Sequence, residues 1–152
     1  MAFADSLTDT ADAAFVRTAA AEAGAVSSLR EEFSRWLRNG FRLDAVRYSD
    51  IVLAVNEAMA NAAEFAYRDG GRDRTFCLQA RREGPGVLAV TVADRGTWRE
   101  AAPASKASAR GRGIPLMRAL ADRFAIDPSP QGTRVYLGFD GCAATLRPVA
   151  SV

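Results

Sequence analysis

Residues 50–68, DIVLAVNEAMANAAEFAYR, most constrain how this chain can fold. They include neither proline nor glycine and are too many for a typical strand, so they predict a helix, with Asp44 as a candidate N-cap for an earlier start. At about 100° per residue, a narrow polar line follows this helix, formed by Asp50, Glu57, Asn61, Glu64 and Arg68. An ordinary surface helix has a broad, charged polar face. The pattern therefore predicts a helix that is mostly covered, with its polar line facing a cavity.

Within this line, Glu57 and Asn61 are one helical turn apart. A carboxylate and a carboxamide in this arrangement can hold a water molecule and a metal ion over the same ligand. The alternative interpretation is an amphipathic helix whose polar stripe is simply solvated, which is common in globular proteins. The helix by itself leaves both interpretations open.

The composition is typical of one soluble globular domain. The chain has 152 residues, of which 49% are hydrophobic and 25% charged, and its net charge of +2 gives no electrostatic reason to expect nucleic acid or membrane as a direct partner. Histidine is absent, which excludes imidazole metal sites and histidine phosphotransfer on this chain. Without a signal-peptide pattern or a membrane-length apolar run, we expect a cytoplasmic protein in which Cys77 and Cys142 are reduced thiols.

Periodicity elsewhere predicts further helices and strands. In chain order, we expect a weak strand at 13–20, a helix at 26–37, strands at 74–82 and 87–93, a helix at 114–123, a short strand at 123–126 and a closing strand at 132–139. Ser27 or Ser28 can cap the first of these helices. The strands on either side of Gly84-Pro85-Gly86 are predicted to form an antiparallel hairpin. Residues 140–152 have no clear pattern.

Three polar or glycine-rich sites interrupt this framework: Glu57 with Asn61, Asp94 with Gly96, and residues 111–113. Gly111-Arg112-Gly113 precedes a predicted helix, where backbone N–H groups can approach a phosphate and Arg112 would add a charge-assisted hydrogen bond. Each site is ambiguous by itself, because turn glycines and turn aspartates are common without any ligand. The Ala- and Ser-rich residues 99–110 predict a mobile loop; an interdomain linker is less consistent with the short remainder of the chain.

The order of these sites resembles the ATP-binding fold shared by histidine kinases, Hsp90, gyrase B and MutL. Within that superfamily the chain looks most like the anti-sigma-factor serine kinases of bacterial stress and sporulation switches. VNEAMANAAEFAY is similar to the first box of that family, ADRG to the second, GRGIPLMRALAD to the third and GTRVYLGF to the last strand. The resemblance covers nearly the whole chain, from about the first strand to Phe139.

We expect an α/β (α+β) two-layer sandwich, in which helices cover one face of a mixed, largely antiparallel sheet. The resemblance implies that this is a Bergerat-type ATP-binding fold. The kinase domain would extend over residues 13–140, between a flexible N-terminus at 1–12 and an irregular tail at 141–152.

The resemblance also implies roles for individual residues. By position, Glu57 would be the general base, Asn61 the magnesium ligand and Asp94 the group that binds the adenine amine, with ATP and Mg²⁺ as cofactors. The residues that would shape the nucleotide pocket are Gly96, Gly111, Arg112 and Gly113, with Thr133 beside Asp94. Residues 97–110 would form the ATP lid.

Two positions depart from the pattern of the family. Trp98 replaces the last glycine of the second box, which usually reads Asp-x-Gly-x-Gly, and Phe65 stands where the first box often has histidine. Both departures bear on kinase activity more than on nucleotide binding.

The function implied by the resemblance is that of an ATP-dependent protein serine/threonine kinase in bacterial transcription regulation. It would phosphorylate a serine of a small anti-anti-sigma protein, sequester a sigma factor and, like much of the family, form a homodimer. The alternatives are a regulator that binds ATP and partners without phosphorylating anything, and an interaction domain with a decayed pocket. ATP binding separates the last alternative from the others, and phosphate transfer separates the kinase from the regulator.

Overall fold

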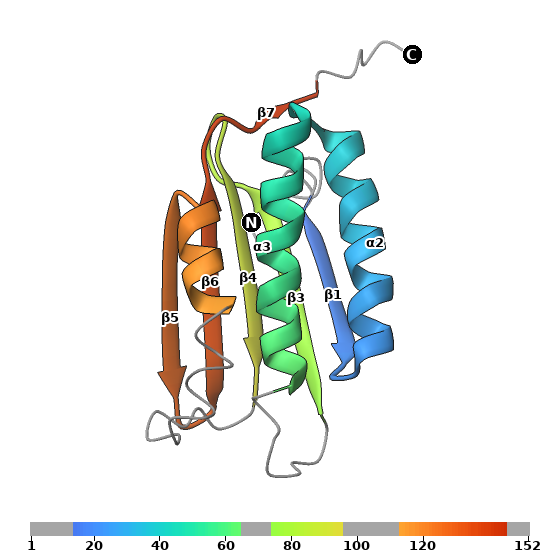
Figure 1. Cartoon of the computed structure of the whole chain (residues 1–152), viewed down its shortest axis with the longest axis vertical. Coiled ribbons are helices and arrows are strands. Elements are labelled where there is room, and N and C mark those ends of the chain that lie inside the picture. Colours follow the sequence, from blue (N-terminus) through green and yellow to red (C-terminus); the bar gives the residue numbers. More distant parts are fainter. Residues whose placement is uncertain (1–13, 65–73, 96–112, 146–152) are drawn as a thin grey trace, which may run out of the picture.

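The computed structural model describes residues 14–64, 74–95 and 113–145, which form two layers. Helices cover one face of a five-stranded sheet whose strand order is β1-β3-β4-β6-β5 (Figure 1). The strands of this sheet are β1 (Phe15–Ala20), β3 (Thr75–Arg82), β4 (Leu88–Asp94), β5 (Arg123–Ser129) and β6 (Gly132–Phe139). The helices are α2 (Ala23–Gly40), α3 (Ala45–Glu64) and a short helix at residues 113–120.

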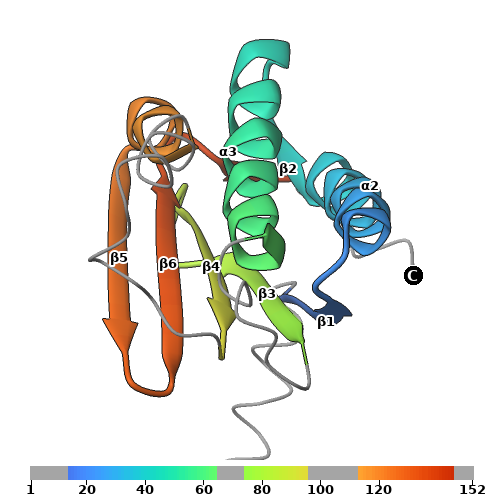
Figure 2. The same cartoon turned by 60° about the horizontal axis from the view of Figure 1, so that its bottom comes forward.

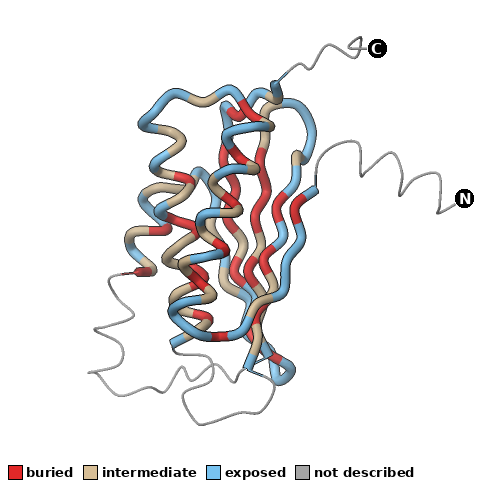
Figure 3. Tube along the Cα trace, turned by 90° about the vertical axis from the view of Figure 1, so that its right-hand side faces the viewer, coloured by how far each residue is buried: buried red, intermediate tan, exposed pale blue. Residues whose placement is uncertain are grey.

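Every strand pairing in the described part of this sheet is antiparallel, and β3 and β4 form the predicted hairpin. Two further views show all the described helices on the same side of the sheet (Figures 2 and 3). The expected two-layer sandwich with a largely antiparallel sheet is therefore confirmed. None of the described helices is long and apolar enough to cross a membrane.

The core lies between α3 and the middle of the sheet. Ile51, Val55 and Met59 recur at helical spacing on the inner side of α3, and each is 0% exposed. The sheet contributes alternate residues of its central strands, namely Phe76, Leu78, Val90, Val92 and Leu137, all at most 1% exposed. Burial of one large apolar side chain contributes about 1.5–3 kcal/mol, so these contacts hold α3 firmly on the sheet.

The starts of the two long helices follow different rules. α2 begins at Ala23, ahead of the predicted serine cap, and its N-cap residue Glu22 makes no side-chain capping hydrogen bond. The serine cap was therefore a wrong prediction. α3 begins at Ala45, where Asp44 Oδ1 accepts a hydrogen bond from the Arg47 backbone N–H at 2.8 Å, as an N-cap does.

Two details of the C-terminal half also differ from expectation. The last helix ends at residue 120, because the chain turns there and Arg123 begins β5, which extends to Ser129. In the region without a clear pattern, β7 (Ala143–Ala144) pairs with β2 (Phe41–Arg42). Two-residue strands carry no periodic signal, so this small sheet could not be predicted. It attaches the chain after β6 to the junction between α2 and α3.

An ionic cluster also joins α3 to the β5–β6 side of the sheet. The Arg47 guanidinium donates to the Asp122 carboxylate and, at 2.8 Å, to the Asp140 carbonyl oxygen. Arg123 donates to both carboxylate oxygens of Asp140, at 2.9 and 3.2 Å. These hydrogen bonds from Arg123 hold the pKa of the Asp140 carboxyl below its ordinary value.

We predict that Arg123→Gln removes an acid-sensitive part of the stability. The pKa of Asp140 is lower in the folded state than its unfolded value of about 3.9. The ion pair therefore contributes to the free energy of unfolding above the unfolded pKa, and this contribution is lost as the pH falls through the folded-state pKa. In thermal melts, the advantage of the wild type over Arg123→Gln should therefore shrink as the pH is lowered from neutral to about 3. Arg81→Gln, which alters an exposed arginine of β3, should follow the wild type throughout. An advantage that stays constant with pH would contradict the assignment.

The β5–β6 turn packs directly against the end of β4. A Cβ atom at Gly132 would lie 1.9 Å from the Asp94 carbonyl oxygen and 2.7 Å from Arg95 Cα, and the φ of Gly132 is +146°. No side chain fits at these distances, so this approach requires glycine.

We predict that the steric overlap in Gly132→Ala lowers the free energy of unfolding by about 1–3 kcal/mol. This loss comes in addition to the cost of holding an alanine at a positive φ. Gly141→Ala is the matched control, because Gly141 has a φ of +68° but nothing lies within 4 Å of its Cβ position. The control should show only the backbone cost, about 1–2 kcal/mol. Urea unfolding of both variants measures the difference, and equal losses would contradict the close contact.

Candidate functional site

The predicted site residues that the structure describes form two clusters, one along α3 and one at the end of β4 and the start of β6. α3 and β4 both run toward the bottom of Figure 1, and the helix at 113–120 begins beside the lower half of α3, where Gly113 lies against Glu57 and Asn61. Glu57, Asn61 and Gly113 form one cluster, which we call the acid–amide cluster. Asp94 and Thr133 form the other, which we call the Asp94–Thr133 pair.

In the acid–amide cluster, the start of the helix at 113–120 packs against the polar side of α3. A Cβ atom at Gly113 would lie 3.1 Å from Glu57 Oε1, 3.1 Å from Asn61 Nδ2 and 3.3 Å from Asn61 Oδ1. Glu57 and Asn61 therefore converge on the N-terminal end of that helix. The first N–H groups and the positive end of the dipole there favour an anion.

Oxygen atoms of this cluster suit Mg²⁺, which prefers carboxylate and carbonyl oxygen ligands. Among the described residues, no group of three or more His, Cys, Asp and Glu side chains could hold a metal ion. Asn61 is the residue of this cluster that would hold such an ion, through its side-chain oxygen.

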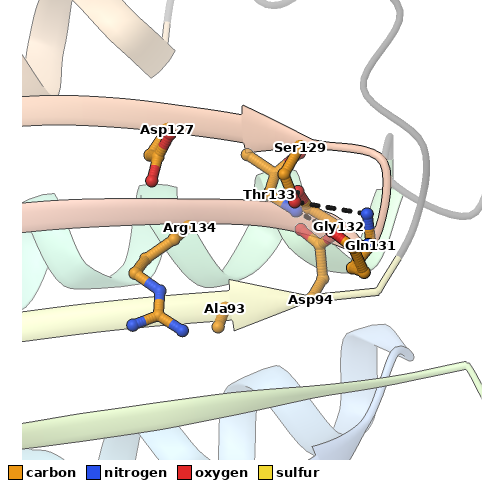
Figure 4. Close-up of a pocket in the computed structure, with 8 residues that line it drawn as sticks. All are labelled: Ala93, Asp94, Asp127, Ser129, Gln131, Gly132, Thr133 and Arg134. Carbon is orange, nitrogen blue, oxygen red and sulfur yellow. Dashed lines mark hydrogen bonds between the residues drawn. The ribbon is translucent and has the colours of Figure 1, made fainter.

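The Asp94–Thr133 pair closes the end of two neighbouring strands. Asp94 is the last residue of β4, and Thr133 is its direct register partner on β6. The Thr133 backbone N–H donates to Asp94 Oδ1 at 3.4 Å (Figure 4). The close approach of Gly132 to the Asp94 backbone holds the two strands together at this point.

The Thr133 side chain is polar and buried. Thr133 is 4% exposed, and its hydroxyl oxygen has no hydrogen-bond partner within the described residues. Buried hydroxyl groups are normally paired, because an unpaired one costs about 1–3 kcal/mol. The pair therefore offers an unused hydroxyl beside a carboxylate, which fits a ligand group that both donates and accepts hydrogen bonds.

A hollow of about 230 Å³ adjoins this pair. Its lining residues are Ala93, Asp94, Asp127, Ser129, Gln131, Gly132, Thr133 and Arg134 (Figure 4). Because side chains alternate along a strand, Ala93 and Arg134 face away from the helices. Asp94 and Thr133, one position along each strand, face the helices. The hollow therefore lies mainly on the open face of the sheet, which is the face that the helices do not cover. It does not include the acid–amide cluster.

Several predicted residues lie outside the described part of the chain: Gly96, Gly111, Arg112, the lid at 97–110, and the departures Phe65 and Trp98. Their roles stay predictions. Sequence reasoning did not single out Gly132, whose contact with Asp94 shapes the second cluster. The available signal was a glycine at the first position of the closing strand, where a turn and a close backbone approach look alike in the sequence.

Comparison with known proteins identifies the family. Residues 18–139 match the histidine kinase-like ATPase domain. A crystal structure of the RsbU and RsbW domains of Rv1364c from Mycobacterium tuberculosis has a similar fold, with a TM-score of 0.66 and 23% identity over 88% of this chain and 33% of that one. The histidine kinase domain of a blue-light activated histidine kinase, EL346 from Erythrobacter litoralis, matches with a TM-score of 0.47 and 23% identity over 62% of this chain and 45% of that one.

This chain therefore spans about a third of the first solved chain and less than half of the second. The family match extends from β1 to the end of β6 and includes both clusters of the candidate site. The chain belongs to the histidine kinase-like ATPase domain family.

Proposed function

We propose that this protein is an anti-sigma factor and an ATP-dependent protein serine/threonine kinase. The observation that carries the proposal is the convergence of Glu57 and Asn61 on the start of the helix at 113–120. In this proposal Glu57 would be the base and Asn61 the metal ligand, and a helix start of this kind favours anions. Membership of an ATPase domain family supports ATP as the nucleotide.

In this proposal, the adenine ring binds at the Asp94–Thr133 pair. The Asp94 carboxylate accepts a hydrogen bond from the adenine amine, and the buried Thr133 hydroxyl gains a partner directly or through a water molecule. The phosphates extend toward Gly113, where the helix dipole and backbone N–H groups favour negative charge. Gly96, Gly111 and Arg112 would complete the pocket.

In the proposed reaction, the γ-phosphate of ATP is transferred to a serine hydroxyl of the acceptor protein, and Glu57 is the general base. Asn61 would hold Mg²⁺ together with phosphate oxygens, and the ion would supply neutralisation of the phosphate charge. Glu57 orients the acceptor hydroxyl and takes its proton. The serine oxygen then bonds to the γ-phosphorus as the bond to the bridging oxygen breaks, and the electron pair leaves with ADP.

The proposed partners rest on the resemblance to anti-sigma-factor kinases and on the similar fold of a structure that contains an RsbW domain. The acceptor is a serine of a small anti-anti-sigma protein, and the sequestered protein is a bacterial sigma factor. The kinase would act in the cytoplasm, in a stress response, as a homodimer.

We predict that Mg-ATP raises the melting temperature. A ligand at 100 times its Kd stabilises a protein by about 2.7 kcal/mol, which for this length is on the order of 5–10 °C. Asp94→Asn should reduce the shift, because one acceptor oxygen is replaced by a donor that opposes the adenine amine. GTP should give a smaller shift, since guanine carries a carbonyl where adenine carries the amine.

The matched control is Asp127→Asn, which makes the same change in the same hollow but on the open face of the sheet. It should keep the shift produced by ATP. No shift with ATP, confirmed by calorimetry, would overturn the nucleotide site, and equal shifts with ATP and GTP would overturn the role of Asp94.

We predict that Glu57→Gln separates chemistry from binding. The variant should bind Mg-ATP normally but transfer phosphate to the acceptor roughly 10²–10⁴ times more slowly, the usual cost of losing a general base. Asn61→Ala should lose Mg-ATP binding and transfer together. Radiolabelled ATP and small acceptor proteins encoded nearby measure the transfer, with Glu31→Gln at an exposed position of α2 as the control.

Transfer by Glu57→Gln at the wild-type rate would show that Glu57 is not the base. Intact ATP binding without transfer to any acceptor would replace the kinase by a non-catalytic regulator. In that case the sequence departures at Phe65 and Trp98 are the first positions to restore to the family pattern.

A further inference from the structure

A second concave site lies at the end of the molecule opposite the candidate nucleotide site. It is a groove of about 430 Å³, lined by Arg38, Phe41, Arg42, Leu43, Ala45 and Tyr48. These residues belong to the end of α2, to β2 and to the start of α3, at the top of Figure 1. At 1.5 Å per residue along α3, Tyr48 lies roughly 20 Å from Asn61. The groove therefore has no residue in common with either cluster of the candidate site.

The groove has an apolar surface on which a side chain can be seated. Phe41 is 4% exposed and packs edge-on against Trp36, so its ring is held in place. Leu43 is half-buried against the core. Ala45, at the start of α3, is exposed and continues this apolar lining.

Two guanidinium groups border this apolar surface. Arg38 donates to the Tyr48 hydroxyl at 2.8 Å, and its Cζ lies 4.9 Å from the centre of the Tyr48 ring. The Tyr48 hydroxyl in turn contacts Ser34 Oγ, so the position of Arg38 is fixed by contacts within the protein. Arg42 is exposed, and no carboxylate of the described residues pairs with it.

No residue that lines the groove is acidic. Asp44 lies between two lining residues, but its carboxylate caps α3 by accepting the Arg47 N–H. The groove also borders the N-terminal end of α3, whose dipole adds to the positive potential. Charged groups of one sign around an apolar surface favour a partner of opposite charge.

We propose that this groove docks an acidic segment of a partner protein. An aliphatic or aromatic side chain of the segment packs on Leu43 and Ala45, above the buried Phe41 ring, and flanking carboxylates pair with Arg38 and Arg42. Arg38 is already held by Tyr48, so little side-chain entropy is lost when a carboxylate binds it.

The test uses fluorescein-labelled synthetic peptides and the full chain. One peptide has a Leu-Phe pair flanked by aspartates, a second has the same pair flanked by lysines, and a third has aspartates flanking Ser-Gly. Fluorescence anisotropy should show binding of the first peptide only. Arg42→Glu should weaken that binding roughly tenfold or more, because a charge-assisted contact becomes a repulsive one.

Arg81→Glu is the matched control, since it makes the same charge change at an exposed position of β3 on the open face of the sheet. It should bind the peptide as the wild type does. Arg42→Glu should also keep the melting shift produced by Mg-ATP, so that failure here is distinguishable from failure of the proposed kinase function.

Three results would overturn the proposal. Equal peptide affinity of Arg42→Glu and Arg81→Glu would show nonspecific charge attraction. Peptide-induced NMR shifts at Thr133 with none at Leu43 or Tyr48 would place the peptide at the nucleotide site. Self-association that competes with the peptide and is lost in Arg42→Glu would assign the groove to a second copy of this chain.

Discussion

The contact between α3 and the middle strands of the sheet determines where the candidate site residues lie. Burial of Ile51, Val55 and Met59 fixes the rotation of α3 about its axis. At about 100° per residue, Glu57 and Asn61 then point to one side of the helix, toward Gly113, and not into the core. Apolar burial thus orients the polar groups, and no polar contact within the site is needed to do so.

The parts of the fold that could be predicted from the sequence are those with a sustained local period. α3, β3, β4 and β6 have such a period, and the neighbourhood of Glu57 and Asn61 follows from one helical turn. The pairing of Asp94 with Thr133 depends on the register between strands that are far apart in sequence, which no local pattern specifies. The expectation that these two residues lie together came from the family resemblance alone. The β2–β7 pairing and the close approach of Gly132 to the Asp94 backbone depend on tertiary contacts that leave no periodic signal in the sequence.

Two glycines permit the close approaches that shape the site, because neither has a side chain. Gly113 lets a helix start come close to Glu57 and Asn61, while Gly132 lets a turn come close to the backbone of Asp94. The two cases differ in what surrounds the missing methyl group. At Gly113 the neighbours are the ends of flexible side chains, which can move by a few tenths of an ångström, whereas at Gly132 they are backbone atoms, which cannot. The Asp94–Thr133 pair is therefore the more rigid of the two clusters.

The polar line on α3 has a consequence for how such proteins diverge. Glu57 and Asn61 are half-buried and lie outside the apolar core, so the core does not select for either residue. One substitution at Glu57 would greatly slow the proposed chemistry while the domain keeps its packing and the groove between α2 and α3. Descendants of an ancestral kinase could therefore become inert regulators in a single genetic step, and such a change would leave no trace in the fold.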